Sequence, residues 1–147
     1  MYKPRCRSSV DKGIPMKKPL QIMFLGTGSD VGKSVLAAGF CRILRRRGYR
    51  VAPFKAQNMA LNSFVTMEGE EMGRAQVMQA HAAGVLPTAD MNPVLLKPTG
   101  EANTQVVVQG KVTGTVSAGE YYRIQGEILP RVMESYRRLS LDYRAMV

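Results

Sequence analysis

The chain has 147 residues, of which 45% are hydrophobic and 22% charged, a length and balance that suit one folded domain and exclude global disorder. Its apolar runs are too short to cross a bilayer, and its first 19 residues lack the apolar segment of a secretory signal, so we expect a cytoplasmic protein without a membrane partner. The net charge of +10 does not predict nucleic-acid binding, because the aromatic residues do not alternate with the basic ones.

The first third of the chain predicts a strand, a helix and a second strand after a basic leader. We expect residues 1–19 to be disordered and residues 20–147 to fold. The run LQIMFL at residues 20–25 is short, apolar and closed by glycine, which predicts a buried parallel strand. Apolar residues then recur at helical spacing over residues 33–47, and Gly48 is suited to end that helix. Residues 50–54 (RVAPF) predict the second strand.

The remainder continues this alternation after a polar connection over residues 55–69. This stretch is long for a structureless connection, and long connections in compact domains are often functional. Four segments carry helix or strand patterns: residues 71–83 and 120–139 are helical, and residues 94–96 and 105–108 are β-like. Pro130 should kink or split the last helix, and residues 143–147 begin another strand. The alternation predicts an α/β fold, in which a parallel sheet is flanked by helices.

The sequence GTGSDVGKS at residues 26–34 indicates a phosphate-binding loop. Glycines let backbone N–H groups curl around a phosphate, Lys33 supplies a positive charge, and the Ser34 hydroxyl can ligate Mg²⁺. The common loop pattern would place glycine at position 27, whereas this chain has Thr27 and a glycine one residue earlier, so its loop is one residue longer. The expected nucleotide contacts come from Thr27, Gly28, Ser29, Asp30, Val31, Gly32, Lys33 and Ser34.

Further motifs extend this interpretation. PFKAQNM at residues 53–59, GRAQ at residues 73–76, MNPVLLKP at residues 91–98 and QVVVQGKVTGT at residues 105–115 resemble the cobyric acid synthase family. The resemblance runs from Leu20 to the C-terminus, and the longer phosphate loop is shared with the wider dethiobiotin-synthetase-like ATPases. It implies a P-loop NTPase-type domain with ATP and Mg²⁺ as cofactors.

The activity implied by this resemblance is that of an ATP-dependent ligase in cobalamin biosynthesis. Members convert peripheral carboxylates of (adenosyl)cobyrinic acid a,c-diamide into amides, with ammonia supplied by a glutaminase domain. In such chemistry ATP phosphorylates a carboxylate and ammonia then displaces the phosphate, so positive groups must neutralise the charge on the transferred phosphoryl group.

The resemblance also implies roles for individual residues. Lys33 and Lys55 are the catalytic candidates, with Lys55 reaching the γ-phosphate and the substrate carboxylate, although an ordinary surface lysine is the alternative at that position. Ser34 and Glu71 are the metal candidates, and Glu71 is equally suited to be a carboxylate at the start of a helix. The substrate candidates are Gln57, Asn58, Asn92 and Lys97. A loop-capping role for the first two of these stays open, and His81 has no predicted partner.

Family members are much longer than this chain. Their synthetase domain continues into an acidic strand, and a glutaminase domain with Cys and His lies beyond; Cys41 does not match that nucleophile because it lies in the predicted first helix. We therefore expect a truncated synthetase part that binds nucleotide weakly, does not complete amidation alone, and is marginally stable or a homo-oligomer. Two alternatives stay open: a regulatory or partitioning ATPase, disfavoured because those often carry an additional lysine near the loop start, and a non-catalytic nucleotide-binding fragment.

Overall fold

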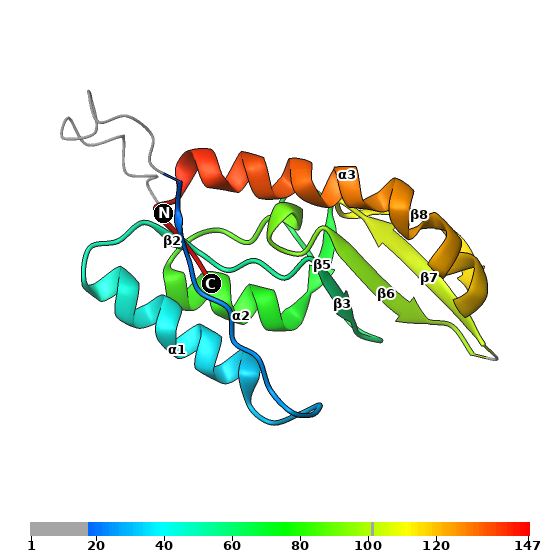
Figure 1. The fold of residues 1–147 in the computed structure, drawn as a ribbon, viewed down its shortest axis with the longest axis horizontal. Helices are drawn as coiled ribbons and strands as arrows, with labels where there is room; N and C mark the ends of the chain where they lie inside the picture. The colour runs from blue at the N-terminus through cyan, green and yellow to red at the C-terminus, as the bar shows by residue number, and fades with distance from the viewer. Residues whose placement is uncertain (1–17, 101) are drawn as a thin grey trace.

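A computed structural model describes residues 18–100 and 102–147 of the chain. The expected disorder of residues 1–19 concerns a segment that, except for its last two residues, lies outside this description. The elements form two parts joined by the long helix α3 (Ala118–Asp142), which runs past both (Figure 1). None of the helices in the described ranges combines the length and apolar character needed to cross a membrane.

The first part is a parallel sheet of three short strands in the order β1-β9-β2. β1 (Leu20–Gln21) and β2 (Val51–Ala52) both pair in parallel with β9 (Ala145–Met146), which lies between them. This confirms the predicted parallel sheet, its first two strands in shortened form, and the strand expected near the end of the chain.

Helix α1 (Lys33–Arg46) packs on this sheet as predicted. Its buried residues Cys41 and Leu44 form a core cluster with Val51 and Ala145, and Gly48 follows the helix with a φ of +86°. Burial raises the pKa of the Cys41 thiol to about 11, which fits the expected core thiol.

The second part is a four-stranded sheet in the order β3-β6-β7-β8, which the sequence predicted only in its middle strands. Its members are β3 (Gln57–Met59), β6 (Val94–Pro98), β7 (Asn103–Val108) and β8 (Lys111–Ser117). β3 pairs with β6 in parallel, and the other pairs are antiparallel. The first half of α3 covers one face of this sheet through a cluster that includes Val94, Val106 and Tyr121.

A small hairpin and helix α2 join the two parts. β4 (Ser63–Val65) pairs with β5 (Glu71–Gly73), and α2 (Arg74–Ala83) follows directly, with the short helix η2 (Ala89–Met91) beyond. The polar connection over residues 55–69 contains two short strands, β3 and β4, that the sequence did not predict. The predicted helix start at residue 71 was wrong, since Glu71–Gly73 pair with β4 before the helix begins.

Of the two outcomes predicted for Pro130, a kink or a split of the last helix, the split does not occur. Helix α3 continues through Pro130 from Ala118 to Asp142. Proline removes one backbone hydrogen bond, but buried residues on both sides of it, Tyr121 and Leu139 among them, anchor the two halves to the core. A capping box fixes the start: the Ser117 hydroxyl accepts from the Glu120 N–H, and the Glu120 carboxylate accepts from the Ser117 N–H.

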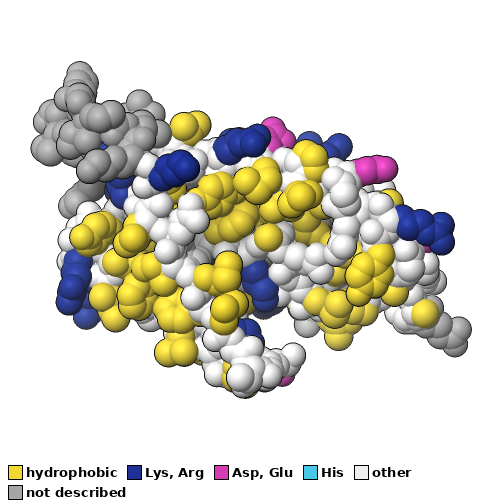
Figure 2. Space-filling model, viewed as in Figure 1, with side chains coloured by type: hydrophobic (Ala, Val, Ile, Leu, Met, Phe, Trp, Pro, Cys, Tyr) yellow, Lys and Arg dark blue, Asp and Glu magenta, His cyan; other side chains and the backbone are white. Residues whose placement is uncertain are grey.

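The segment around β1 departs most from its prediction. A buried strand was expected over residues 20–25, but only Leu20–Gln21 pair, and Met23 and Leu25 are 80% and 83% exposed. Among the described residues, β1 pairs with β9 alone, at the edge of the sheet. Figure 2 shows hydrophobic side chains spread over the region of α1 and the segment after β1.

Candidate functional site

The phosphate loop joins β1 to α1. Lys33 is the first residue of α1, and Gly32 precedes it as the N-cap with a φ of +89°, a conformation that favours glycine. The backbone N–H groups of Val35 and Leu36 donate to the Gly32 carbonyl at 3.1 and 3.0 Å. In this fully described helix no acidic residue lies in the first turn and no side chain caps it, so the positive helix end is available to an anion.

Inside the loop, the Lys33 ammonium folds back and donates to the Gly28 carbonyl. A Cβ atom at Gly26 would lie 2.8 Å from Val31 Cγ2 and 3.0 Å from Lys33 Cδ. Position 26 therefore needs glycine because other loop side chains pack against its backbone. This gives a physical reason for the glycine that stands one residue before the common pattern.

Lys55 lies just beyond β2, at the carboxyl end of a parallel strand, where the sequence placed it. Its backbone N–H donates to the Met91 carbonyl at 2.9 Å, and its exposed ammonium donates to Asn58 Oδ1 at 3.0 Å. Asn58 Nδ2 in turn donates to Gln76 Oε1 on α2 at 3.0 Å. Two of the predicted site residues, Lys55 and Asn58, are thus in direct contact.

Gln57 lies apart from this pair. Successive residues of a strand point to opposite faces, and Gln57 Oε1 accepts from the Tyr121 hydroxyl of α3 at 2.6 Å. The structure therefore brings Asn58 to the α2 face, with Lys55, and Gln57 to the α3 face. A cavity of about 330 Å³ opens between Gln57, Val94 and α3 on that second face.

Glu71 and Lys97, predicted as a metal ligand and a substrate contact, bind each other. The Lys97 ammonium donates to Glu71 Oε2 at 2.8 Å, and the Ser63 hydroxyl donates to the same oxygen at 2.6 Å. These hydrogen bonds, led by the one from Lys97, hold the pKa of the Glu71 carboxyl below its ordinary value. Glu71 is consequently a carboxylate at neutral pH, already neutralised in part by a lysine.

Asn92 is 1% exposed and fully engaged by backbone. Its Nδ2 donates to the carbonyls of Lys55 and Val94 at 3.1 and 2.9 Å, and its Oδ1 accepts from the Gly73 N–H at 2.9 Å. These bonds join the segment after β2 to the start of α2. The predicted contact of Asn92 with substrate stays a prediction, and the observed bonds give it a structural role.

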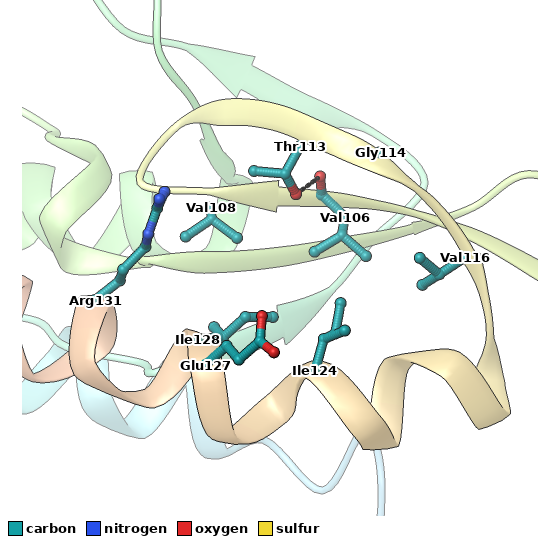
Figure 3. A pocket seen from close by; sticks show the side chains of 9 residues that line it. All are labelled: Val106, Val108, Thr113, Gly114, Val116, Ile124, Glu127, Ile128 and Arg131. Carbon is teal, nitrogen blue, oxygen red and sulfur yellow. Dashed lines mark hydrogen bonds between the residues drawn. The ribbon is translucent and has the colours of Figure 1, made fainter.

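Other polar groups lie away from this site. His81 lies exposed in the last turn of α2, and the described residues contain no group of three His, Cys, Asp or Glu side chains placed to hold a metal. A hollow of about 270 Å³ between the β7–β8 hairpin and α3 is lined by residues such as Val106, Ile124 and Glu127 (Figure 3). It contains none of the predicted site residues.

Two site residues escaped the sequence analysis. Gln76 and Gln79 of α2 are 1% and 5% exposed, and Gln79 Nε2 donates to the Ser34 carbonyl of α1 at 3.1 Å. The signal that could have found them is two glutamines three residues apart on the buried face of a helix, since such groups need partners.

Comparison with known proteins places these motifs in a family. Residues 22–145 match the family model described as the CobQ/CobB/MinD/ParA nucleotide binding domain. The chain is similar to cobyric acid synthases of Syntrophobacter fumaroxidans, with 64% identity over 86% of this chain and 24% of that protein. The cobyric acid synthase of Lachnoclostridium phytofermentans is 53% identical over 86% of this chain and 25% of that protein. The cobyric acid synthase of Yersinia enterocolitica is 56% identical over 87% of this chain and 25% of that protein.

These matches confirm the resemblance to cobyric acid synthase that the motifs indicated. The chain spans about a quarter of the length of the curated relatives it matches. No solved structure matches it.

Proposed function

Because the chain belongs to the CobQ/CobB/MinD/ParA nucleotide binding domain family, we propose that it is the ATP-binding part of a ligase that activates carboxylates for amidation. The substrate class proposed from the relatives' name is a cobyrinic acid diamide with peripheral carboxylates. Ammonia would come from a glutaminase portion outside the residues matched here, as the family resemblance implies.

One observation supports this function most strongly. The phosphate loop follows β1 and Lys55 follows β2, and both strands run parallel to β9 in one sheet. The carboxyl ends of parallel strands meet at one edge, so Lys33 and Lys55 emerge at the same edge. Two cations there suit a reaction in which a phosphoryl group passes between two anionic partners.

Bound Mg²⁺-ATP would supply the phosphoryl group and positive charge to offset the charge that develops on it. The open helix start and Lys33 would hold the phosphates, and Lys55 would neutralise the γ-phosphate and the attacking carboxylate. Ser34 offers a hydroxyl and Glu71 a carboxylate, which are the oxygen ligands that Mg²⁺ prefers, provided that Glu71 exchanges Lys97 for the metal. Asn58 would orient Lys55, while contacts of Gln57, Asn92 and Lys97 with substrate are the finer part of the proposal.

Calorimetric titration with Mg²⁺-ATP tests the nucleotide site. We expect the wild type to bind, and Lys33→Ala to weaken binding by at least about tenfold, because a charge-assisted contact to phosphate is lost. Lys111→Ala, on β8, is the matched control and should bind as the wild type does. Equal binding by Lys33→Ala and wild type would instead favour a fragment that binds nucleotide without using it.

A second assay addresses turnover. The isolated chain, supplied with ATP, ammonia and a cobyrinic acid diamide, should form no amide, because it matches only about a quarter of the length of the relatives. Amide formation by the chain alone would sink this part of the proposal.

A further inference from the structure

A continuous row of side-chain amides connects Lys55 to the phosphate loop. The Lys55 ammonium donates to Asn58, Asn58 donates to Gln76 at 3.0 Å, and Gln76 donates to Gln79 Oε1 at 3.5 Å. Gln79 then donates to the carbonyl of Ser34 at 3.1 Å. The row crosses from the segment after β2 through α2 to the first turn of α1, so it spans the two places that carry the catalytic lysines.

The two ends of the row fix its direction. An ammonium group can only donate, so Asn58 must turn its oxygen to Lys55 and its Nδ2 to Gln76. A backbone carbonyl can only accept, so Gln79 must turn its Nε2 to Ser34. Each of the three amides between these ends accepts from the group before it and donates to the group after it, which leaves a single arrangement of the whole row. The link of 3.5 Å between the glutamines is its longest.

Close packing holds the row in place. Gln76 and Gln79 are buried, and Asn58 is partly buried. Gly73 lies against them: a Cβ atom there would be 2.4 Å from Asn58 Nδ2 and 2.9 Å from Gln76 Oε1. Gly73 has a φ of −71° and a ψ of 136°, which any residue adopts, so the need for glycine arises from the amides and not from the backbone.

We propose that Gln76 and Gln79 are positioning residues, which set the Lys55 ammonium relative to the phosphate loop so that it meets the γ-phosphate of bound ATP. This rests on the proposed nucleotide function. Gln76 itself touches no reacting atom and acts through Asn58. An ammonium has three donors, and the row takes one, so the others are directed while staying available to phosphate oxygens.

The test is the preference of the full chain for ATP over ADP, measured by calorimetry in Mg²⁺. Lys55→Ala should lower this preference by about tenfold, because a cation contact to the γ-phosphate is lost. Gln76→Met, similar in shape but unable to hydrogen-bond, should lower it by a comparable factor while ADP affinity stays within about twofold of wild type. In the Lys55→Ala background, Gln76→Met should have no further effect on the preference.

A second variant tests the same positioning role in case Gln76→Met does not fold. Gly73→Ala adds one methyl group that displaces Asn58 and Gln76, together with Asn92, and it should also lower the ATP preference. Gly119→Ala is its control, because a Cβ atom at Gly119 meets nothing within 4 Å. Circular dichroism and thermal unfolding identify which variants are folded.

The outcomes separate the inference from its premise. If Lys33→Ala abolishes binding and Lys55→Ala lowers the ATP preference, but Gln76→Met and Gly73→Ala keep it, the positioning role is overturned and the proposed function stands. The same holds if the effect of Gln76→Met adds fully to that of Lys55→Ala. A wild-type chain that binds neither nucleotide overturns both.

Discussion

The two halves of the site are held by different means. The Lys55 half is fixed by buried side chains: Met72 and Met91 are 0% exposed, and Asn92 and Gln76 bond on several sides. In the phosphate-loop half, the Lys33 and Gln79 side chains donate to backbone carbonyls, and apolar side chains around the loop are open to solvent. Packing of buried side chains therefore fixes the segment that carries Lys55. One flank of the phosphate loop, which carries Lys33, is exposed to solvent.

That flank is defined by Met23, Leu25, Val31, Val35 and Leu36, and is called here the β1–α1 surface. These residues are 52% to 83% exposed, with Val31 lowest and Leu25 highest. Exposed apolar residues gathered on one segment are typical of surfaces that contact a partner, and the unpaired edge of β1 adds backbone groups able to pair. The expectation of a marginally stable or self-associating chain stays a prediction on this ground.

The largest expected effect contrasts two methionines, one from each region. Met72→Ala should lower the free energy of unfolding by about 2–5 kcal/mol, because a fully buried side chain leaves a cavity in the cluster with Met91 and Leu139. Met23→Ala, at an 80% exposed position, should change it by less than about 0.5 kcal/mol. Urea denaturation of both variants measures the difference, and equal effects would break the comparison.

The second prediction concerns the glycine that closes the phosphate loop. Gly26→Ala would press its methyl group on Val31 and on the Lys33 side chain, and should weaken Mg²⁺-ATP binding by about tenfold. Gly39→Ala, in α1 with nothing within 4 Å of the added atom, should leave affinity unchanged and stabilise the helix slightly. Calorimetry decides, and unchanged affinity in Gly26→Ala would show that the loop adapts freely.

The third prediction tests the β1–α1 surface. Sedimentation of the wild type should show association that rises with concentration, and Leu25→Lys combined with Leu36→Lys should reduce it, because two charges enter an apolar contact. Lys substitution of Leu86, 51% exposed beyond α2, is the control and should leave association as it is. A monomeric wild type that unfolds cooperatively would contradict the expectation.

The sequence predicted the features that follow local rules and missed those that depend on tertiary packing. The phosphate loop, α1 and Gly48 follow local rules of glycine geometry and helix periodicity, and these were found. β8 was missed and the sequence did not exclude a split at Pro130, because tertiary packing decided both: β8 pairs along β7, and α3 is anchored on either side of the proline. The Ser117–Glu120 capping box was readable in the sequence, and it would have placed the start of α3 correctly.

Site residues divide in the same manner. Lys33 and Lys55 were found because each follows a strand in a recognisable motif. The separation of Gln57 from Asn58 depends on the pairing of β3 with β6, which is a long-range contact. Gln76 and Gln79 belong to a helix whose buried face looked apolar. Their hydrogen-bond partners, Asn58 in β3 and Ser34 in α1, are known only from the structure.

The smallest expected effect concerns the charge of Glu71, which lies in the Lys55 half of the site. Hydrogen bonds from Lys97 and Ser63 lower the pKa of Glu71 in the folded state, so they stabilise the fold above the ordinary carboxyl range. This contribution is lost as pH falls through the lowered pKa, because protonation removes the charge that Lys97 binds. For a partly exposed pair it should amount to at most about 1 kcal/mol. Glu71→Gln should therefore destabilise the chain at pH 7 and lose that effect at an acid pH below the lowered pKa of Glu71, by urea denaturation at both pH values. A destabilisation that is equal at the two pH values would mean that Glu71 acts through its shape and not its charge, and Glu134→Gln, more exposed on α3, is the control for titration elsewhere.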